Sequence, residues 1–284
     1  MVASAWPGAA LLTGIAMVAF AGNSLLCRMA LAEGAIDAPS FTVIRLLSGA
    51  VTLVALMWFR QGRPTALAAS GSWRSAFTLF FYAITFSYAY VTLSAASGAL
   101  ILFGCVQGTM IAAALLSGER PTRLESIGWL LAGTGLIALL LPGASAPSLL
   151  GASLMALSGV GWGLYSLFGR QESRPLAATT GNFVRVLAPS MLLLPLAAGQ
   201  FSASREGVLL AILAGSLTTG IGYIVWYAAL PRLSALQAAL VQLSVPAIAA
   251  FGGVLLLSEP ITMRLVVCGS LILGGIWLSV GGKR

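Results

Sequence analysis

Residues 115–122 read LLSGERPT, and residues 255–262 read LLLSEPIT. The two segments lie 140 residues apart, and each joins a leucine run to a serine, a glutamate and a threonine. Further residues coincide at the same offset: Leu93-Ser94-Ala95 with Leu233-Ser234-Ala235, Ala99-Leu100 with Ala239-Leu240, and Arg45 with Arg185. With a slip of one residue, Gly128 and Gly133 also match Gly269 and Gly274. Because charges are scarce in this chain, the shared Glu and Arg positions indicate an internal repeat.

The composition places this repeat in a lipid bilayer. The chain has 284 residues, of which 59% are hydrophobic and 8% charged, and its mean hydropathy is +0.99. A soluble domain carries about a quarter of its residues as charges, so this chain cannot cover a water-facing surface. Its 33 glycines fit lipid-embedded helices, where glycine is more frequent than in soluble ones. The net charge of +8 comes from single basic residues between apolar runs, which argues against a nucleic-acid partner.

Charges and Pro/Gly clusters divide the chain into apolar stretches of about 20 residues, the length that an α-helix needs to cross a bilayer. Ten spans are expected, at residues 8–27, 39–59, 73–92, 97–116, 124–141, 149–169, 179–198, 207–229, 235–257 and 262–281. The first is interpreted as a retained helix, since no basic region of a cleaved signal peptide precedes it. The sequence therefore predicts an all-α polytopic membrane protein without a soluble domain.

Basic residues are distributed unequally between the two ends of these spans. The end that carries the N-terminus has ten: Arg60, Arg63, Arg74, Arg120, Arg123, Arg170, Arg174, Arg232, Lys283 and Arg284. The opposite end has three, Arg28, Arg205 and Arg264. Cytoplasmic loops of membrane proteins carry the excess of Lys and Arg, so both termini are expected in the cytoplasm.

The repeat and the span count together predict the architecture. Each half, residues 1–143 and residues 148–284, holds five spans, and an odd number makes the second half cross the membrane in the opposite sense. Inverted-topology repeats are typical of secondary transporters, whose substrate site lies near the midplane between the repeats. We therefore expect two inverted five-helix repeats that form one transport domain with alternating access.

These features resemble a known family. The ten short helices, the five-plus-five repeat, and the segments 115–122 and 255–262, each followed by spaced glycines, are similar to the ten-helix EamA branch of the drug/metabolite transporter superfamily. Within that branch the chain most resembles the YddG-type exporters of aromatic and other amino acids. The resemblance covers essentially the whole chain, and it implies efflux of a small metabolite across a bacterial inner membrane.

Two arginines, Arg45 and Arg185, are the only charges that lie away from the ends of the predicted spans. An intramembrane charge marks a functional site by default, but each arginine is close enough to a helix end to snorkel to the membrane surface. The favoured interpretation is a repeat-related pair of structural anchors, and the alternative is capture of a substrate carboxylate. Glu119 and Glu259 are interpreted as partners of the positive N-terminus of the following helix or of a loop arginine, with a gate charge as the alternative.

Polar and aromatic side chains near midspan are the candidate substrate site. Hydrocarbon offers such groups no hydrogen bonds, which favours an inward position. The candidates are Tyr82 and Phe86 on one stripe with Tyr90, Trp162 and Tyr165, Tyr223 and Trp226, Gln107, Asn23 with its neighbour Ser24, and Gln242. Gln242 lies four residues before Pro246, which cannot donate to its carbonyl and so leaves a free acceptor near midspan.

These aromatic residues have an alternative interpretation as helix packing or as the interfacial belt, to which Tyr90, Tyr227 and Trp73 are assigned as candidates. If they line a cavity, few charges and several rings suit a neutral zwitterion or an aromatic ring better than a phosphate, which favours several Lys or Arg. The substrate class expected from the residues is therefore amino acids rather than nucleotide sugars.

Chemistry-bearing groups are few. No acidic residue lies deep in a span and histidine is absent, so the carboxylate or His relay of proton-driven pumps has no counterpart. Facilitated movement is expected; a proton-coupled drug or metabolite effluxer and a nucleotide-sugar carrier remain the alternatives. An enzyme would need a nucleophile with a base, a metal cluster or paired carboxylates, so neither an enzyme nor a cofactor is expected. Cys27, Cys105 and Cys268 lie in apolar runs and are interpreted as packing residues.

Glycines are interpreted as helix contacts. Gly104 and Gly108 form a GxxxG pair, and Gly159, Gly161 and Gly163 share one span. Such contacts serve either a rocking interface or an oligomer, although a ten-helix repeat pair can enclose its site as a monomer.

Overall fold

The structure is a computed structural model, and it describes residues 6–61, 70–118, 120–141, 143, 146–169, 174–195, 201–229 and 241–281. Within these ranges the regular elements are helices, and β pairing is limited to an isolated antiparallel bridge between Ile36 and Ala203. The elements in chain order are α1 (Trp6–Ala32), α2 (Ala38–Gln61), α3 (Trp73–Tyr90), α4 (Ala95–Leu116), α5 (Arg123–Leu140), α6 (Leu149–Gly169), α7 (Pro175–Ser190), the 3-10 turn η1 (Met191–Leu193), α9 (Arg205–Leu213), the π-helix η2 (Ala214–Ile221), α10 (Gly222–Ala229), α12 (Ser244–Leu257) and α13 (Met263–Gly281).

The predicted all-helical fold is confirmed for the described residues, and it is consistent with a polytopic membrane protein. By length and composition, six helices of the described ranges can cross a membrane: Ala10–Ala32, Ala38–Arg60, Ala95–Leu116, Arg123–Leu140, Leu149–Gly169 and Arg205–Trp226. Two shorter apolar helices, Ser244–Leu257 and Met263–Ser279, follow them in the chain. The start of the predicted span 235–257 lies outside the described residues, and the helix that is described there begins at residue 244.

Hydroxyl side chains fix where several helices begin. Ser72, Ser94 and Ser204 each cap a helix by accepting a hydrogen bond from the backbone N–H three residues later. At α5, Thr122 and Glu125 form a reciprocal capping box. The acidic residue in the first turn of α5 is Glu125. Glu119, which was expected near the same N-terminus, lies outside the described residues.

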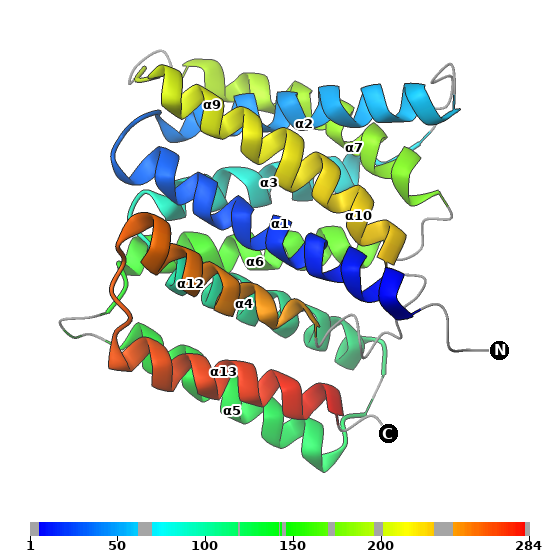
Figure 1. Ribbon diagram of the computed structural model, residues 1–284. Coiled ribbons are helices and arrows are strands. Elements are labelled where there is room, and N and C mark those ends of the chain that lie inside the picture. The colour runs from blue at the N-terminus through cyan, green and yellow to red at the C-terminus, as the bar shows by residue number, and fades with distance from the viewer. Residues whose placement is uncertain are drawn as a thin grey trace.

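The helices surround α1, which crosses the middle of the bundle (Figure 1). It packs against α12, α10 and η2, and it also contacts α3, α4 and α9. On the neighbouring layers, α6 packs between α3 and α4, and α2 packs against α7, α9 and η2. The beginning of α1 and the end of α13 lie at the same end of the bundle in Figure 1.

Glycines allow close contact where α6 enters between α3 and α4. A Cβ added at Gly159 would lie 2.7 Å from the Leu102 carbonyl oxygen, and one at Gly161 would lie 3.2 Å from the Tyr82 backbone nitrogen. The expected packing role of the α6 glycines is confirmed. At the GxxxG pair of α4, the described residues make no close backbone contact, because a Cβ at Gly104 meets a side chain at 3.8 Å and one at Gly108 meets no described atom within 4 Å.

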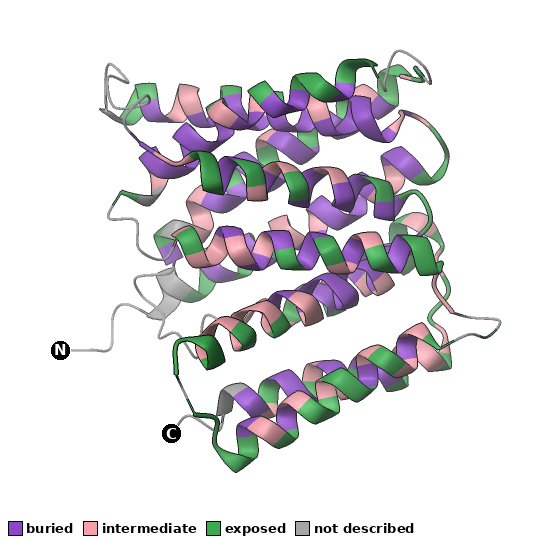
Figure 2. Cartoon of the chain, turned by 180° about the vertical axis from the view of Figure 1, so that it is seen from behind, coloured by how far each residue is buried: buried purple, intermediate pink, exposed green. Residues whose placement is uncertain are grey.

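The pair formed by α5 and α13 stands apart from the rest of the bundle, as Figures 1 and 2 show from opposite sides. The two backbones touch, since a Cβ added at Gly128 would lie 2.4 Å from the Gly275 carbonyl oxygen. Outside that contact the pair carries exposed apolar side chains, Leu130, Ile137 and Trp277 among them. Apolar surface of this kind suits contact with lipid, in keeping with a membrane fold.

Candidate functional site

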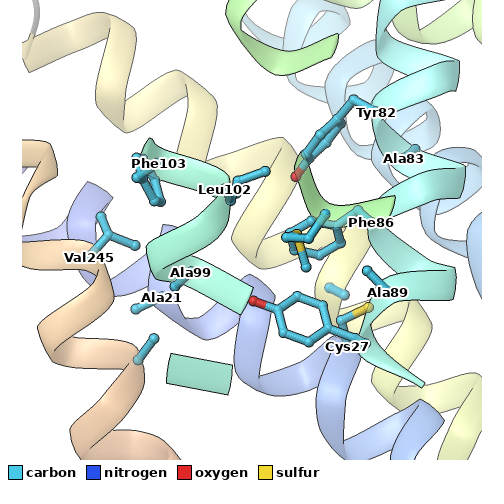
Figure 3. Packing of buried hydrophobic residues seen from close by; sticks show 14 of the residues in the cluster. Ala21, Cys27, Tyr82, Ala83, Phe86, Ala89, Ala99, Leu102, Phe103 and Val245 are labelled. Atoms are coloured by element: carbon cyan, nitrogen blue, oxygen red, sulfur yellow. The ribbon is translucent and has the colours of Figure 1, made fainter. Parts of the chain in front are cut away.

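A small cavity of about 30 Å³ lies at the centre of the bundle, between α1, α3, α4, α6, η2 and α10. Its lining comes from both predicted halves of the chain and consists of Phe20, Asn23, Ser24, Tyr82, Phe86, Leu102, Phe103, Trp162, Thr218, Thr219 and Tyr223. Figure 3 shows Leu102 of α4 facing Tyr82 of α3 across this region. The volume accommodates water and is too small for an amino acid, so the central space is closed in this conformation.

Aromatic rings form a continuous wall of this cavity. The Trp162 ring lies 5.0 Å from that of Tyr82 and 5.2 Å from that of Tyr223, measured between centroids. Phe86 extends the wall along α3, 5.3 Å from Tyr82, and Phe20 of α1 meets Tyr223 edge-on at 6.0 Å. These separations are those of favourable aromatic pairs. The wall therefore joins helices of both halves and presents ring faces and edges to the cavity.

A chain of polar side chains crosses the same cavity. The Tyr82 hydroxyl accepts from Asn23 Nδ2 at 3.3 Å and from Arg45 Nη2 at 3.1 Å. On the other side of Asn23, the Thr218 hydroxyl oxygen lies 3.4 Å from Oδ1. Four helical segments thus meet through Tyr82 and Asn23, and the amide and hydroxyl groups are the polar part of an otherwise aromatic surface.

The π-helix η2 brings two threonines to the cavity. Wider turns of this kind interrupt α-helices mostly as short segments and frequently at functional sites. Here Thr218 and Thr219 both donate to the Ala214 carbonyl, and both line the cavity. Gly215 lets the segment approach α2, because a Cβ there would lie 2.1 Å from the Arg45 carbonyl oxygen.

The two intramembrane arginines differ in their surroundings. Arg45 is only 1% exposed, and its guanidinium carbon lies 4.9 Å from the centroid of the Phe86 ring, so it does not snorkel. Arg185 is half-buried and donates to the backbone carbonyls of Ser70 and Gly181. Its contacts tie α7 to the segment before α3, as expected of an anchor.

Five of the nine side chains predicted to bind substrate line the cavity: Asn23, Tyr82, Phe86, Trp162 and Tyr223. The other four lie elsewhere. Tyr165 is buried behind Trp162 at 5.6 Å, Trp226 packs on Phe20 at 5.9 Å, and Gln107 and Gln242 are half-buried outside the lining.

The interpretation of Pro246 changes with the observed start of α12. This helix begins at Ser244, so the proline lies in its first turn, where a missing N–H breaks no intrahelical bond. The chain is interrupted at Leu243, between Gln242 and α12, and the Ser244 hydroxyl donates to the Val241 carbonyl. A helix break near Gln242 is therefore present, but its polar groups do not reach the cavity.

Tyr90, a candidate for the interfacial belt, is instead fully buried and stacks edge-on against Phe86 at 4.8 Å. Trp73 is half-exposed at the start of α3, as expected of a belt residue. The side chain of Tyr227 lies outside the described residues. The cavity residues that the sequence did not indicate are Phe20, Leu102, Phe103, Thr218 and Thr219. Phe20 was detectable, since it lies one helical turn before Asn23 and Ser24.

A charged network closes the end of the bundle away from the N-terminus. Arg28 at the end of α1 pairs with Glu259, with 3.0 Å between Nε and Oε1. Arg28 Nη1 also donates to the carbonyls of Tyr90 and Val91, and Glu259 Oε2 accepts from the Ala95 N–H at the start of α4. Glu259 therefore pairs with an arginine, as one of its two predicted roles required. It also binds a helix N-terminus, but that of α4 rather than that of the following helix.

Metal chemistry finds no support in the side chains that the structure describes, since no three His, Cys, Asp or Glu residues there gather closely enough to hold an ion. Cys27 and Cys268 are buried and Cys105 is half-buried, each as a free thiol in the helix packing.

Residues 149–281, which include α6, the lining threonines and α13, match the model of the EamA-like transporter family. The second half of the chain is therefore similar to the EamA-like transporters. An uncharacterized transporter of Archaeoglobus fulgidus is 27% identical to it over 174 residues, which are 60% of this chain and 62% of the relative. An uncharacterized protein of Pseudomonas aeruginosa is 56% identical over 268 residues, which are 94% of this chain and 93% of the relative.

A crystal structure, titled only as that of a protein, superposes on this chain with a TM-score of 0.68. The alignment covers 97% of this chain and 99% of the other at 20% identity, which shows a shared fold and nothing about substrate. The chain thus combines several helices that are long and apolar enough to cross a membrane with a second half similar to the EamA-like transporters, and its central cavity is the candidate functional site.

Proposed function

We propose that this protein is an EamA-like transporter that exports small neutral metabolites, aromatic and other neutral amino acids, by alternating access through the central cavity. The observation that carries this proposal is the cavity wall itself, in which rings of Tyr82, Trp162 and Tyr223 surround the amide of Asn23. Such a surface offers stacking to an apolar or aromatic side chain and hydrogen bonds to a zwitterion. It is similar in kind to what a YddG-type amino-acid exporter requires.

An inverted five-plus-five repeat is part of the proposal, and the helix contacts support it. Exchanging the two halves maps α1 on α6, α2 on α7, α3 on the α9–α10 run, α4 on α12 and α5 on α13. The contact of α6 with α4 then corresponds to that of α1 with α12, and the contact of α6 with α3 to that of α1 with α10. The pairs α2 with α7 and α5 with α13 map onto themselves.

We propose an inner-membrane location with cytoplasmic termini. The common end of α1 and α13 carries Arg60, Arg74, Arg120 and Arg123 among the described residues, and the basic excess in the sequence lies on that side. Export then requires the cavity, closed in this conformation, to open alternately to the two ends of the bundle.

The test is uptake by proteoliposomes of the purified chain, with labelled phenylalanine, leucine, a cationic dye and a sugar nucleotide, each with and without an imposed pH gradient. We expect both amino acids to equilibrate down their gradients. Uphill accumulation driven by the pH gradient would support the proton-coupled alternative, and uptake of the sugar nucleotide alone would support the nucleotide-sugar alternative.

Matched variants connect transport to the cavity. Trp162→Ala removes a lining ring, whereas Trp277→Ala removes a ring that is 63% exposed on the outer face of α13. We expect transport to fall at least tenfold in the first variant and to stay within twofold of the parent in the second. Equal transport by both variants would exclude the cavity as the substrate path.

A further inference from the structure

Arg45 is the most deeply buried charge of the described chain, and its guanidinium is only partly satisfied. The side chain is 1% exposed, and Nη2 donates to the Tyr82 hydroxyl at 3.1 Å. Nε and Nη1 are buried and find no acceptor among the described residues. A buried charge with unused donors is costly, so such groups are normally paired or bound to a ligand.

No carboxylate of the described residues neutralises this charge. The ion pair that the described residues form is Arg28 with Glu259, at one end of the bundle. Around Arg45 lie the Phe86 and Tyr82 rings, with centroids 4.9 and 5.4 Å from its guanidinium carbon. These cation–π contacts offset part of the charge, but they provide no acceptor for the N–H groups of Nε and Nη1.

The backbone of Arg45 is held in place by close packing. The Ser48 hydroxyl donates to its carbonyl at 3.1 Å, and the absence of a side chain at Gly215 lets η2 rest directly on that carbonyl. The Tyr82 and Phe86 rings that contact the guanidinium also line the cavity. The Tyr82 hydroxyl connects Arg45 to Asn23, which lines it as well.

We propose that Arg45 recognises the carboxylate of the transported molecule, and that the cavity opens toward it by movement of the Tyr82 and Phe86 rings. This inference rests on the proposed function and names its substrate class: a monocarboxylate that carries an apolar or aromatic group. One guanidinium matches one negative charge, whereas a phosphate or dicarboxylate would favour several basic residues. The free Nε and Nη1 are the charge-assisted donors, and the Trp162 and Tyr223 rings receive the apolar part.

The experiment compares three ligands of the same size that differ in charge. Phenylalanine has a carboxylate and an ammonium group, phenylalaninamide lacks the carboxylate, and 3-phenylpropionate lacks the ammonium group. Binding is measured on the purified full chain as ligand-dependent thermal stabilisation, and transport as uptake by proteoliposomes. The wild type is expected to bind both carboxylates and to discriminate against the amide by about 10- to 100-fold, because hydrogen bonds to charged groups contribute about 1.5–3 kcal/mol.

Variants separate recognition from packing. Arg45→Gln is expected to lose the preference for the carboxylate ligands while keeping its weak affinity for the amide, and Arg45→Lys to retain part of the preference. Arg185→Gln, which removes the other intramembrane arginine, is expected to discriminate like the wild type. If Arg45 were only structural, its substitution would lower the affinity for all three ligands by the same factor.

The outcomes distinguish this inference from the proposed function. Wild-type protein that binds the amide as tightly as phenylalanine would overturn the inference without any variant, even if Arg45→Gln fails to fold. Persistence of the carboxylate preference in Arg45→Gln would also overturn it. Arg45-dependent binding of 3-phenylpropionate without binding of phenylalanine would support the carboxylate site and overturn amino acids as the substrate.

Discussion

Weakening the ion pair between Arg28 and Glu259 should open the end of the bundle away from the N-terminus. This pair joins α1, the α3–α4 turn and the segment after α12, and the side chains of Arg28 and Glu259 are 21% and 12% exposed. Glu259→Gln preserves the shape of the side chain and removes its charge. Alternating access requires these segments to separate at this end, so the pair stabilises the closed state more than the open one.

The size of the effect follows from the contacts that change. A hydrogen bond to a charged partner contributes about 1.5–3 kcal/mol and a neutral one about 0.5–1.5 kcal/mol, so the substitution costs about 1–2 kcal/mol. Both side chains are largely shielded, so solvent removes only part of this difference. A shift of 1–2 kcal/mol raises the population of the open state about 5- to 30-fold.

Cys27 reports this opening, because it lies one residue before Arg28 and is fully buried. In a background with Cys105 and Cys268 replaced by alanine, the labelling rate of Cys27 by a membrane-impermeant maleimide should rise about 5- to 30-fold in Glu259→Gln. The matched control is Glu33→Gln, which removes an exposed carboxylate at the same end of the bundle. If the two glutamine variants are labelled at the same rate, the ion pair does not hold this end closed.

Two further predictions concern packing and the polar chain. Gly128→Ala should lower the midpoint of thermal unfolding in detergent, because the new Cβ would lie 2.4 Å from the Gly275 carbonyl oxygen. Gly133→Ala is the control and should leave the midpoint unchanged, since a Cβ there meets nothing within 4 Å. Equal midpoints would contradict the close contact of α5 and α13. Tyr82→Phe should lower stability by about 1–3 kcal/mol, because two buried donors lose their shared acceptor, while Tyr88→Phe on the exposed face of the same helix should have no such effect. Similar losses in both tyrosine variants would show that the hydroxyl of Tyr82 is not the acceptor.

Part of the candidate site could be predicted because helical periodicity is local. Tyr82 and Phe86 are one turn apart in α3, and a polar or aromatic group at midspan is unfavourable toward lipid, so their inward position follows from the sequence. Leu102 gave no such signal, since a leucine is equally stable facing lipid or protein. Thr218 and Thr219 were not predicted for another reason. They lie in a π-helix, where the inward-facing residues differ from those that a regular period of 3.6 residues predicts.

The pairing of Arg28 with Glu259 could not be read from the chain either, because 231 residues separate them and their helices approach only when α1 packs against α4 and α12. The sequence placed Glu259 at a helix N-terminus, which is a local preference of carboxylates. The identity of that helix was decided by the tertiary structure. Ser258 has a left-handed backbone conformation, with a φ of 52°, and the Glu259 side chain that follows it reaches the N-terminus of α4.

By itself, the sequence predicted an all-helical membrane protein and indicated a repeat of about 140 residues, because the apolar length of a segment and the spacing of its charges are local properties that the surrounding solvent selects. It also indicated the aromatic stripe of α3. Only the tertiary structure decided that the repeat-related Arg45 and Arg185 differ, one enclosed beside the Tyr82 ring and the other bound to backbone carbonyls of Ser70 and Gly181. The physical reason is that the environment of a buried charge is set by the helices packed around it, and those neighbours lie far away in the sequence.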